Sequence, residues 1–144
     1  FIILGFEKIK IKKVILKNKK IIFVINKKYK KGISTSIKCG LKKISNNSTG
    51  FIIVHGDMPF IKSSHINKIY KSMNALNEKI FIPIIKNKIG NPIGFCASMK
   101  ETVYKAKGDI GAKKLIQKNK KIIKYIKFKK RLMFKDIDQK TDIK

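Results

Sequence analysis

The chain has 144 residues, 43% of them hydrophobic, which suits a single domain, residues 1–144, with a real hydrophobic core. Its 36 lysine and arginine residues against 8 acidic ones give a formal charge of +28, but Arg131 is the only arginine, which argues against a sequence-specific DNA reader. No apolar run approaches the roughly 18 residues of a membrane span and no signal-peptide pattern precedes the first strand, so we expect a cytoplasmic protein without a membrane partner.

The lysine excess has two interpretations. Lysine, isoleucine and asparagine dominate along the whole chain, as an AT-rich coding bias would produce, and the lysines would then form a solvated surface. Alternatively, the lysines form a face that binds polyanions. In either case we expect any nucleic-acid binding to be non-specific, because arginine contacts to bases are missing.

Short apolar runs predict the strands. Residues 1–4, 21–25 and 51–55 are β-branched or aromatic and apolar almost throughout, which is typical of strands covered on both faces. The runs 80–85 and 92–97 surround a turn, and 122–128 is the last apolar run. We expect 92–97 to be the antiparallel member of the sheet.

Helical patterns alternate with these strands. Residues 7–20 are ambiguous between strand and helix, whereas 34–44 and 111–120 predict helices. The clearest helix is 63–76, which Ser63 or Ser64 can cap and which has an apolar stripe of Ile66, Ile69, Tyr70, Met73 and Leu76. The alternation predicts an α/β fold: a three-layer sandwich with a doubly wound, mostly parallel, Rossmann-like sheet.

Aspartates stand out in a chain so poor in acid. Asp57 directly follows the strand 51–55, Asp109 precedes the helix 111–120, and Asp136 and Asp138 are two residues apart, so in an extended segment their side chains face the same way. Carboxylates at the carboxyl ends of strands lie where α/β folds bind ligands. With Mg²⁺ they would hold phosphate oxygens, because this hard ion prefers oxygen ligands. Asp109 has the alternative role of a helix cap.

Glycines and hydroxyl residues supply a second candidate. Gly32 precedes Ser34, Thr35 and Ser36, and Lys38 follows one turn into the predicted helix. Free backbone N–H groups at a helix N-terminus form an anion site, although Ser and Thr also begin most helices without binding anything. The stretches 89–95 and 108–112 are weaker signals of the same kind.

The order of these motifs is more specific than any one of them. The series N-x-x-Y-x-x-G-x-S-x-S-[IL]-[KR]-x-G-L, GD-x-P, P…G-N-P, GD-x-GA and D-I-D…D resembles the MobA-like nucleotidyltransferase family, most closely its molybdenum cofactor cytidylyltransferase branch. The similarity spans nearly the whole chain. The matching residues are Asn26, Tyr29, Gly32, Ser34, Ser36, Ile37, Lys38, Gly40, Leu41, Gly56, Asp57, Pro59, Pro83, Gly90, Asn91, Pro92, Gly108, Asp109, Gly111, Ala112, Asp136, Ile137, Asp138 and Asp142.

The resemblance implies an enzyme that transfers a nucleoside monophosphate from CTP or GTP onto a phosphorylated acceptor such as molybdopterin. It implies Asp57 as the main Mg²⁺ ligand and catalytic residue, with Asp136 or Asp138 as its helper. The segment Ser34–Lys38, including Thr35 and Ser36, would contact the nucleotide. Gly90, Asn91 and Pro92, together with Gly108, Asp109 and Gly111, would shape the acceptor site.

The chain departs from the family pattern in three places. The opening glycine-rich loop LAAGxSxRMGxxK is absent, so we expect a domain that is incomplete at its N-terminus. The usual GDQP reads GDMP, with Met58 in place of a hydrogen-bonding glutamine, and DIDTPED reads DIDQKTD. Two alternatives therefore stay open: a truncated relative without catalysis, or a lysine-rich α/β protein that binds polyanions or nucleic acid.

Overall fold

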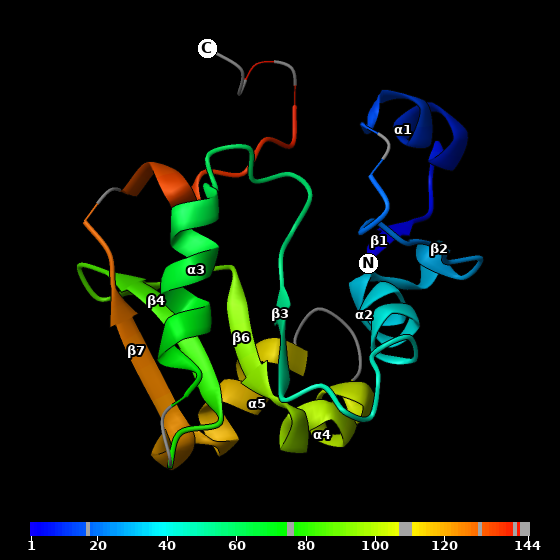
Figure 1. The fold of residues 1–144 in the computed structure, drawn as a ribbon. Helices are drawn as coiled ribbons and strands as arrows, with labels where there is room; N and C mark the ends of the chain where they lie inside the picture. The colour runs from blue at the N-terminus through cyan, green and yellow to red at the C-terminus, as the bar shows by residue number, and fades with distance from the viewer. Residues whose placement is uncertain (17, 75–76, 107–110, 130, 140, 142–144) are drawn as a thin grey trace. The chain divides into compact units, whose positions relative to one another are not determined.

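The structure is a computed structural model that describes residues 1–144 except 17, 75–76, 107–110, 130, 140 and 142–144 (Figure 1). The chain forms two compact units. Unit 1 comprises Phe1–Ser48 and Lys100–Lys118, and unit 2 comprises Thr49–Met99 and Asn119–Lys144. The prediction of one domain over 1–144 stays a prediction, and each unit is described by itself.

Unit 1 is built on a parallel pair of strands. Strand β1 (Ile2–Leu4) pairs with β2 (Phe23–Ile25), and Leu4 of β1 is buried. Helix α2 (Ile33–Leu41) packs against β1, with Gly40 close to the side chain of Ile3. The other elements of the unit are α1 (Lys8–Val14), η1 (Tyr29–Lys31), α4 (Lys100–Lys105), which packs on α2, and α5 (Gly111–Lys118).

The ambiguous segment 7–20 contains the helix α1. None of its residues is buried, and Ile9 and Val14 are 66% and 79% exposed. Strand-like alternation and helix-like spacing overlap in this segment, so the local pattern did not decide between them. The helix begins after Glu7, whose φ of 46° lies in the left-handed region.

Unit 2 contains a mixed sheet with the strand order β3-β6-β4-β5. Antiparallel pairs join β3 (Gly50–Ile53) to β6 (Ile93–Cys96), β6 to β4 (Ile80–Ile85), and β4 to β5 (Lys88–Ile89). On its other side β4 pairs in parallel with β7 (Ile123–Lys127). Short 3₁₀ turns complete the unit: η2 (Ala97–Met99), η3 (Lys120–Ile122) and η4 (Arg131–Phe134).

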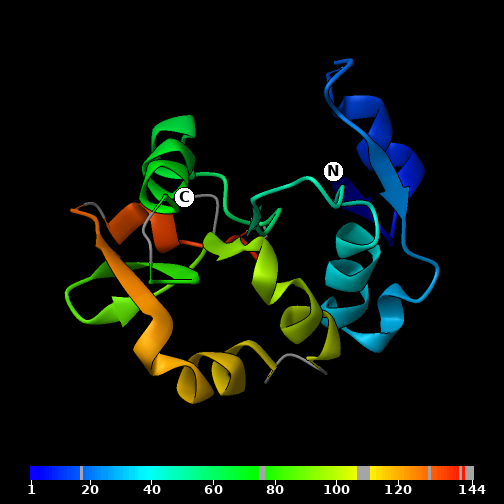
Figure 2. The same cartoon turned by 60° about the horizontal axis from the view of Figure 1, so that its bottom comes forward.

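Helix α3 (Ser63–Ser72) lies along one face of this sheet, as Figures 1 and 2 show. Its residue Ile69 packs with Phe81 of β4 and Ile126 of β7, and these three side chains are 0%, 0% and 5% exposed. Burying apolar side chains of this size contributes about 1.5 to 3 kcal/mol each. This cluster is therefore a hydrophobic core that holds α3 on the sheet of unit 2.

The mixed α/β fold agrees with the prediction, and β6 is antiparallel as expected. The run 51–55 was expected to form a strand covered on both faces, but within unit 2 β3 is a terminal strand, and all four of its residues are half-buried. The turn between 85 and 92 contains the additional strand β5, which forms a tight hairpin with β4. Its turn residues Lys86 and Asn87 have positive φ angles of 44° and 65°.

The predicted serine cap of α3 is wrong. The residue before the helix is Lys62, and its backbone N–H donates to Nδ1 of His65 over 3.1 Å. A ring nitrogen thus replaces the serine hydroxyl as the acceptor at this helix end. Tyr70 of the predicted apolar stripe is 63% exposed, and Leu76 lies outside the described residues. Among the helices of the described part of the chain, none is long and apolar enough to cross a membrane.

Candidate active site

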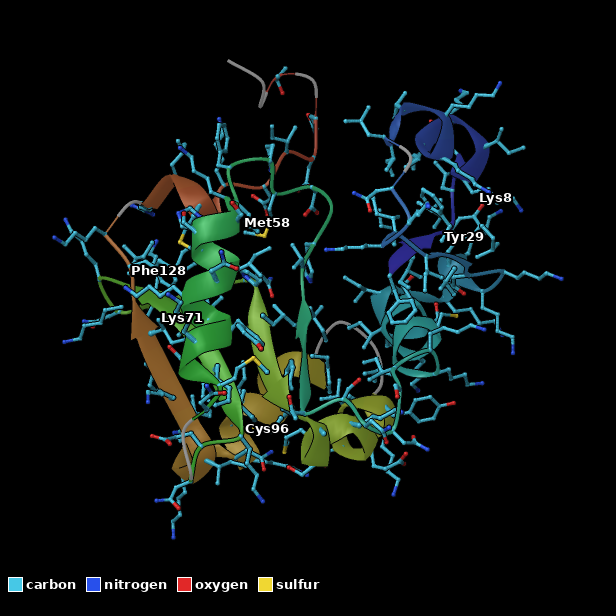
Figure 3. All side chains as sticks on the ribbon, viewed as in Figure 1. Lys8, Tyr29, Met58, Lys71, Cys96 and Phe128 are labelled. Carbon is cyan, nitrogen blue, oxygen red and sulfur yellow. The ribbon has the colours of Figure 1, made fainter. Side chains whose placement is uncertain are left out.

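A short loop after β3 presents Asp57. The strand ends at Ile53, and the chain then turns through His55 and Gly56, leaving the carboxylate of Asp57 exposed. The next residue, Met58, is only 8% exposed (Figure 3). The burial of its apolar side chain gives a structural reason for methionine where the family pattern has a glutamine.

The segment that carries Asp136 and Asp138 meets this loop directly. The backbone N–H of Ile137 donates to the carbonyl oxygen of Asp57 over 2.8 Å. Ile137 is half-buried, and the two aspartates on either side of it are exposed. The structure therefore brings together the two carboxylate motifs of unit 2 that are far apart in the sequence.

The loop before β6 lies at the same edge of the sheet. The backbone N–H of Gly90 donates to the carbonyl oxygen of Pro83 over 3.2 Å, and Nδ2 of Asn91 lies 3.5 Å from Nδ1 of His55. A Cβ atom on Gly90 would lie 2.7 Å from ring atoms of Phe134, which is closer than real side chains approach. Only glycine therefore lets this loop pack on η4, the turn that leads to Asp136.

The carboxylates suit a hard divalent cation by their donor chemistry. Asp57, Asp136 and Asp138 offer the oxygen ligands that Mg²⁺ and Mn²⁺ prefer. Within the described residues, no group of three or more His, Cys, Asp or Glu side chains is arranged to hold a metal. The three aspartates therefore do not form a three-ligand cage. Mg²⁺ is usually held by one or two carboxylates together with substrate phosphates, so such a cation does not need a three-ligand cage.

The hydroxyl motif belongs to unit 1, where it surrounds a buried asparagine. Nδ2 of Asn26, a residue that is 2% exposed, donates to Oγ1 of Thr35 over 2.8 Å and to Oγ of Ser36 over 2.9 Å. Its Oδ1 accepts the backbone N–H of Lys28 over 2.9 Å. Thr35 in turn donates to backbone oxygen, with the carbonyl of Gly32 at 2.9 Å. Two of the predicted nucleotide-contacting hydroxyls thus hold the turn before α2 in place.

Helix α2 begins after Gly32, whose φ of 96° is in the region that favours glycine. Ser34 lies in the first turn of the helix and is half-buried. Farther along, the ammonium of Lys38 lies 5.6 Å from the ring centre of Tyr104, on α4. Lys38, at the end of the predicted nucleotide-binding segment Ser34–Lys38, thus contacts α4 within unit 1.

Gly108, Asp109 and Gly111 are the remaining residues that were predicted to shape the acceptor site. Gly108 and Asp109 lie outside the described residues, and Gly111 is the first residue of α5.

Sequence reasoning passed over two residues that the structure makes prominent. His55 stands two residues before Asp57 and contacts Asn91. The only feature of the sequence that could have pointed to His55 is its place in the tripeptide His-Gly-Asp. Asn26 had a signal in the motif order, but nothing indicated that it would be buried.

Comparison with known families identifies the fold. A model of the MobA-like NTP transferase domain matches residues 4–122. The chain belongs to the family of MobA-like NTP transferase domains. Members of this family are nucleotidyltransferases, whose substrates are nucleoside triphosphates. The family resemblance of the motif series is thereby confirmed at this level.

Several solved structures share the fold of this chain. A homologue of Rv0371c from Mycobacterium sp. strain JC1 matches with a TM-score of 0.79 and 18% identity over 98% of this chain and 69% of its own. Rv0371c of Mycobacterium tuberculosis H37Rv in complex with manganese matches at 0.75 and 16%, over 98% and 73%. A 4-diphosphocytidyl-2C-methyl-D-erythritol synthase from Anaerococcus prevotii matches at 0.73 and 17%, over 98% and 73%. At such identities the likeness shows the fold alone.

Proposed function

We propose that this MobA-like protein transfers a nucleoside monophosphate, CMP from CTP, onto a phosphorylated acceptor of the molybdopterin type. The observation that carries the proposal is the hydrogen bond from Ile137 to Asp57, because it joins two carboxylate segments in a chain with only 8 acidic residues. Family membership supports the transfer reaction. The preference for CTP over GTP rests on the sequence similarity to the cytidylyltransferase branch.

Asp57 is the proposed catalytic metal ligand, and Asp136 or Asp138 is its partner. The divalent cation, when bound, supplies charge that stabilises the α-phosphate and the departing pyrophosphate. We take Mg²⁺ as the cation on the donor chemistry. The manganese complex of Rv0371c supports a divalent cation in this fold.

In the proposed reaction, a phosphate oxygen of the acceptor forms a bond to the α-phosphorus of the nucleotide. The bond between that phosphorus and the oxygen bridging to the β-phosphate breaks, and pyrophosphate leaves. The reaction needs little covalent chemistry from the protein, so it is sufficient to align the two reactants and to neutralise the charge on their phosphates. We propose that Gly90, Asn91 and Pro92 line the acceptor side, and the contact of Asn91 with His55, two residues before Asp57, supports this role.

Within unit 1, we propose that Ser34, Thr35, Ser36 and Lys38 bind the nucleotide through the first turns of α2. The hydrogen bonds from Asn26 preorganise this turn, and such preorganisation lowers the entropic cost of binding. Gly108, Asp109 and Gly111 remain proposed contributors to the acceptor site. A cytoplasmic location is likewise a proposal.

Calorimetric titration of the chain with CTP and with GTP, in Mg²⁺ and in EDTA, tests the proposal. We expect CTP to bind more tightly than GTP, to need Mg²⁺ and Asp57, and to persist at moderate salt, because short-range coordination is screened less than surface charge. All titrations are run at two salt concentrations, and a random DNA duplex is titrated in the same way for comparison. Tight DNA binding that persists at high salt, without Mg²⁺-dependent nucleotide binding, would overturn the proposal.

A further inference from the structure

A basic groove runs between α3 and β7 of unit 2. It has a volume of about 690 Å³ and is lined by Ser64, Asn67, Lys68, Lys71, Ser72 and Lys124. This volume is within the range of roughly 300 to 1,000 Å³ that is usual for ligand sites. Three of the six lining residues are lysines and none is acidic, so the groove offers positive charge and hydrogen-bond donors to an anion.

The groove is built from one face of the helix. The five lining residues on α3 occupy positions i, i+3, i+4, i+7 and i+8, which places them on one stripe of the helix. That stripe lies beside the apolar stripe of Ile69, whose side chain packs on Ile126 of β7. Lys124 comes from the strand itself, two residues before Ile126 and therefore on the same face of the sheet.

One of the lysines is held in position. Nζ of Lys68 donates to the backbone oxygen of Lys127 over 2.6 Å and lies 4.7 Å from the ring centre of Phe128. Its ammonium therefore bridges α3 and the end of β7, and it keeps two further N–H groups for a ligand. Figure 3 shows the two sides of this bridge, with Lys71 on α3 and Phe128 just after β7.

The groove is separate from the carboxylate site in its chemistry and its residues. It contains none of Asp57, Asp136 or Asp138. The groove is thus distinct from the proposed catalytic site.

We infer that this groove is a second anion site, which binds a chain of closely spaced phosphates. The ligand is either a free oligophosphate or the backbone of a single-stranded nucleic acid, because both present phosphates in series to the ammonium groups. Binding at this site does not need a divalent cation. It is governed by counterion release, so it weakens steeply as salt rises.

The test uses tripolyphosphate and a labelled 20-nucleotide oligothymidylate, each titrated in EDTA at several salt concentrations. The groove variant is Lys71→Gln with Lys124→Gln, and it leaves the bridging Lys68 in place. The matched control, Lys8→Gln with Lys88→Gln, removes the same charge from exposed positions on α1 and β5. We expect the groove variant to bind about tenfold more weakly or worse, with the salt slope for the oligonucleotide reduced by roughly 1.4.

Weakening of tripolyphosphate binding alone identifies a free oligophosphate as the ligand, and weakening of oligonucleotide binding identifies a nucleic-acid backbone. Equal weakening in the control variant, or no binding of either probe by the unmodified chain, would overturn the inference. An Asp57→Asn chain is included, and it should bind both probes as the unmodified chain does. Its failure to bind CTP would then bear on the proposed transfer reaction and not on the groove.

Discussion

The backbone N–H of Ile137 donates to the carbonyl oxygen of Asp57 over 2.8 Å. This bond fixes the loop after β3 against the segment after η4, so that the carboxylate of Asp57 and those of the two aspartates around Ile137 belong to one edge of unit 2. Because the bond is made by the backbone, it does not depend on the aspartate side chains themselves. Side-chain variants can therefore remove a carboxylate without releasing the loop.

Asp57→Asn should abolish nucleotide transfer with almost no loss of stability. The side chain is exposed, so the folded state loses little, while the proposed main metal ligand becomes a neutral amide. We expect Mg²⁺-dependent CTP binding to weaken by at least about 100-fold. Mutating residues that only hydrogen-bond to metal ligands already lowers metal affinity or activity by about 10- to 100-fold. Calorimetry and thermal unfolding measure the two effects. Unchanged CTP binding would contradict the assignment of Asp57.

Asn26→Ala should destabilise unit 1. The substitution removes the partner that Asn26 provides to the hydroxyls of Thr35 and Ser36 and to the N–H of Lys28, and the loss of each hydrogen bond of this kind costs about 0.5 to 1.5 kcal/mol. Urea unfolding measures the loss. Asn47→Ala, at an exposed position, is the matched control and should change the free energy of unfolding by less than about 0.5 kcal/mol. Equal effects of the two variants would show that the network contributes little.

Gly90→Ala should disturb the candidate active site through Phe134. The added Cβ would lie 2.7 Å from the phenyl ring, so the ring or the loop must move, at a cost of about 1 to 3 kcal/mol. A double variant with Phe134→Leu should recover part of this stability, because the smaller side chain leaves room for the methyl group. A double-mutant cycle by urea unfolding measures the coupling, and strictly additive effects would argue against the contact.

Protonation of His65 should lower the stability of the folded chain in mild acid. Burial, and then the charge of Lys62, lower the pKa of His65 from its ordinary value of 6.5. The unfolded chain therefore binds the proton at a higher pH than the folded chain, and the stability that His65 contributes is present above pH of about 6.5 and is lost as the pH falls below it. Protonation also removes Nδ1 as the acceptor for the N–H of Lys62 at the start of α3.

Thermal unfolding between pH 7.5 and 5 tests this prediction. The His65→Asn chain keeps a side-chain acceptor near Lys62 but cannot titrate, so its melting temperature should fall less as the pH decreases. His55→Gln removes the other of the two histidines and serves as the control. If the His65→Asn chain kept the full pH dependence, another group would be responsible.

Local pattern was enough to find the strands and the fold class. Continuous apolar runs such as 80–85 are buried whatever their partners are, because transfer of isoleucine and phenylalanine out of water depends on the side chain itself. Local pattern did not decide between strand and helix in 7–20, where the apolar spacing fits both. It also did not show that a histidine ring, and not a serine hydroxyl, is the acceptor at the start of α3. In those places several local solutions have similar free energies.

Tertiary structure decided how the motifs are used. The sequence by itself identified Asp57, Asp136 and Asp138 as the unusual acidic residues and placed them after strands, but their proximity depends on a backbone hydrogen bond between distant segments. It also could not show that Thr35 and Ser36 are bonded to the buried Asn26, or that Lys68 is fixed at the end of β7. Hydrogen bonds and charge contacts act over a few ångströms, so their partners are set only when the chain has folded.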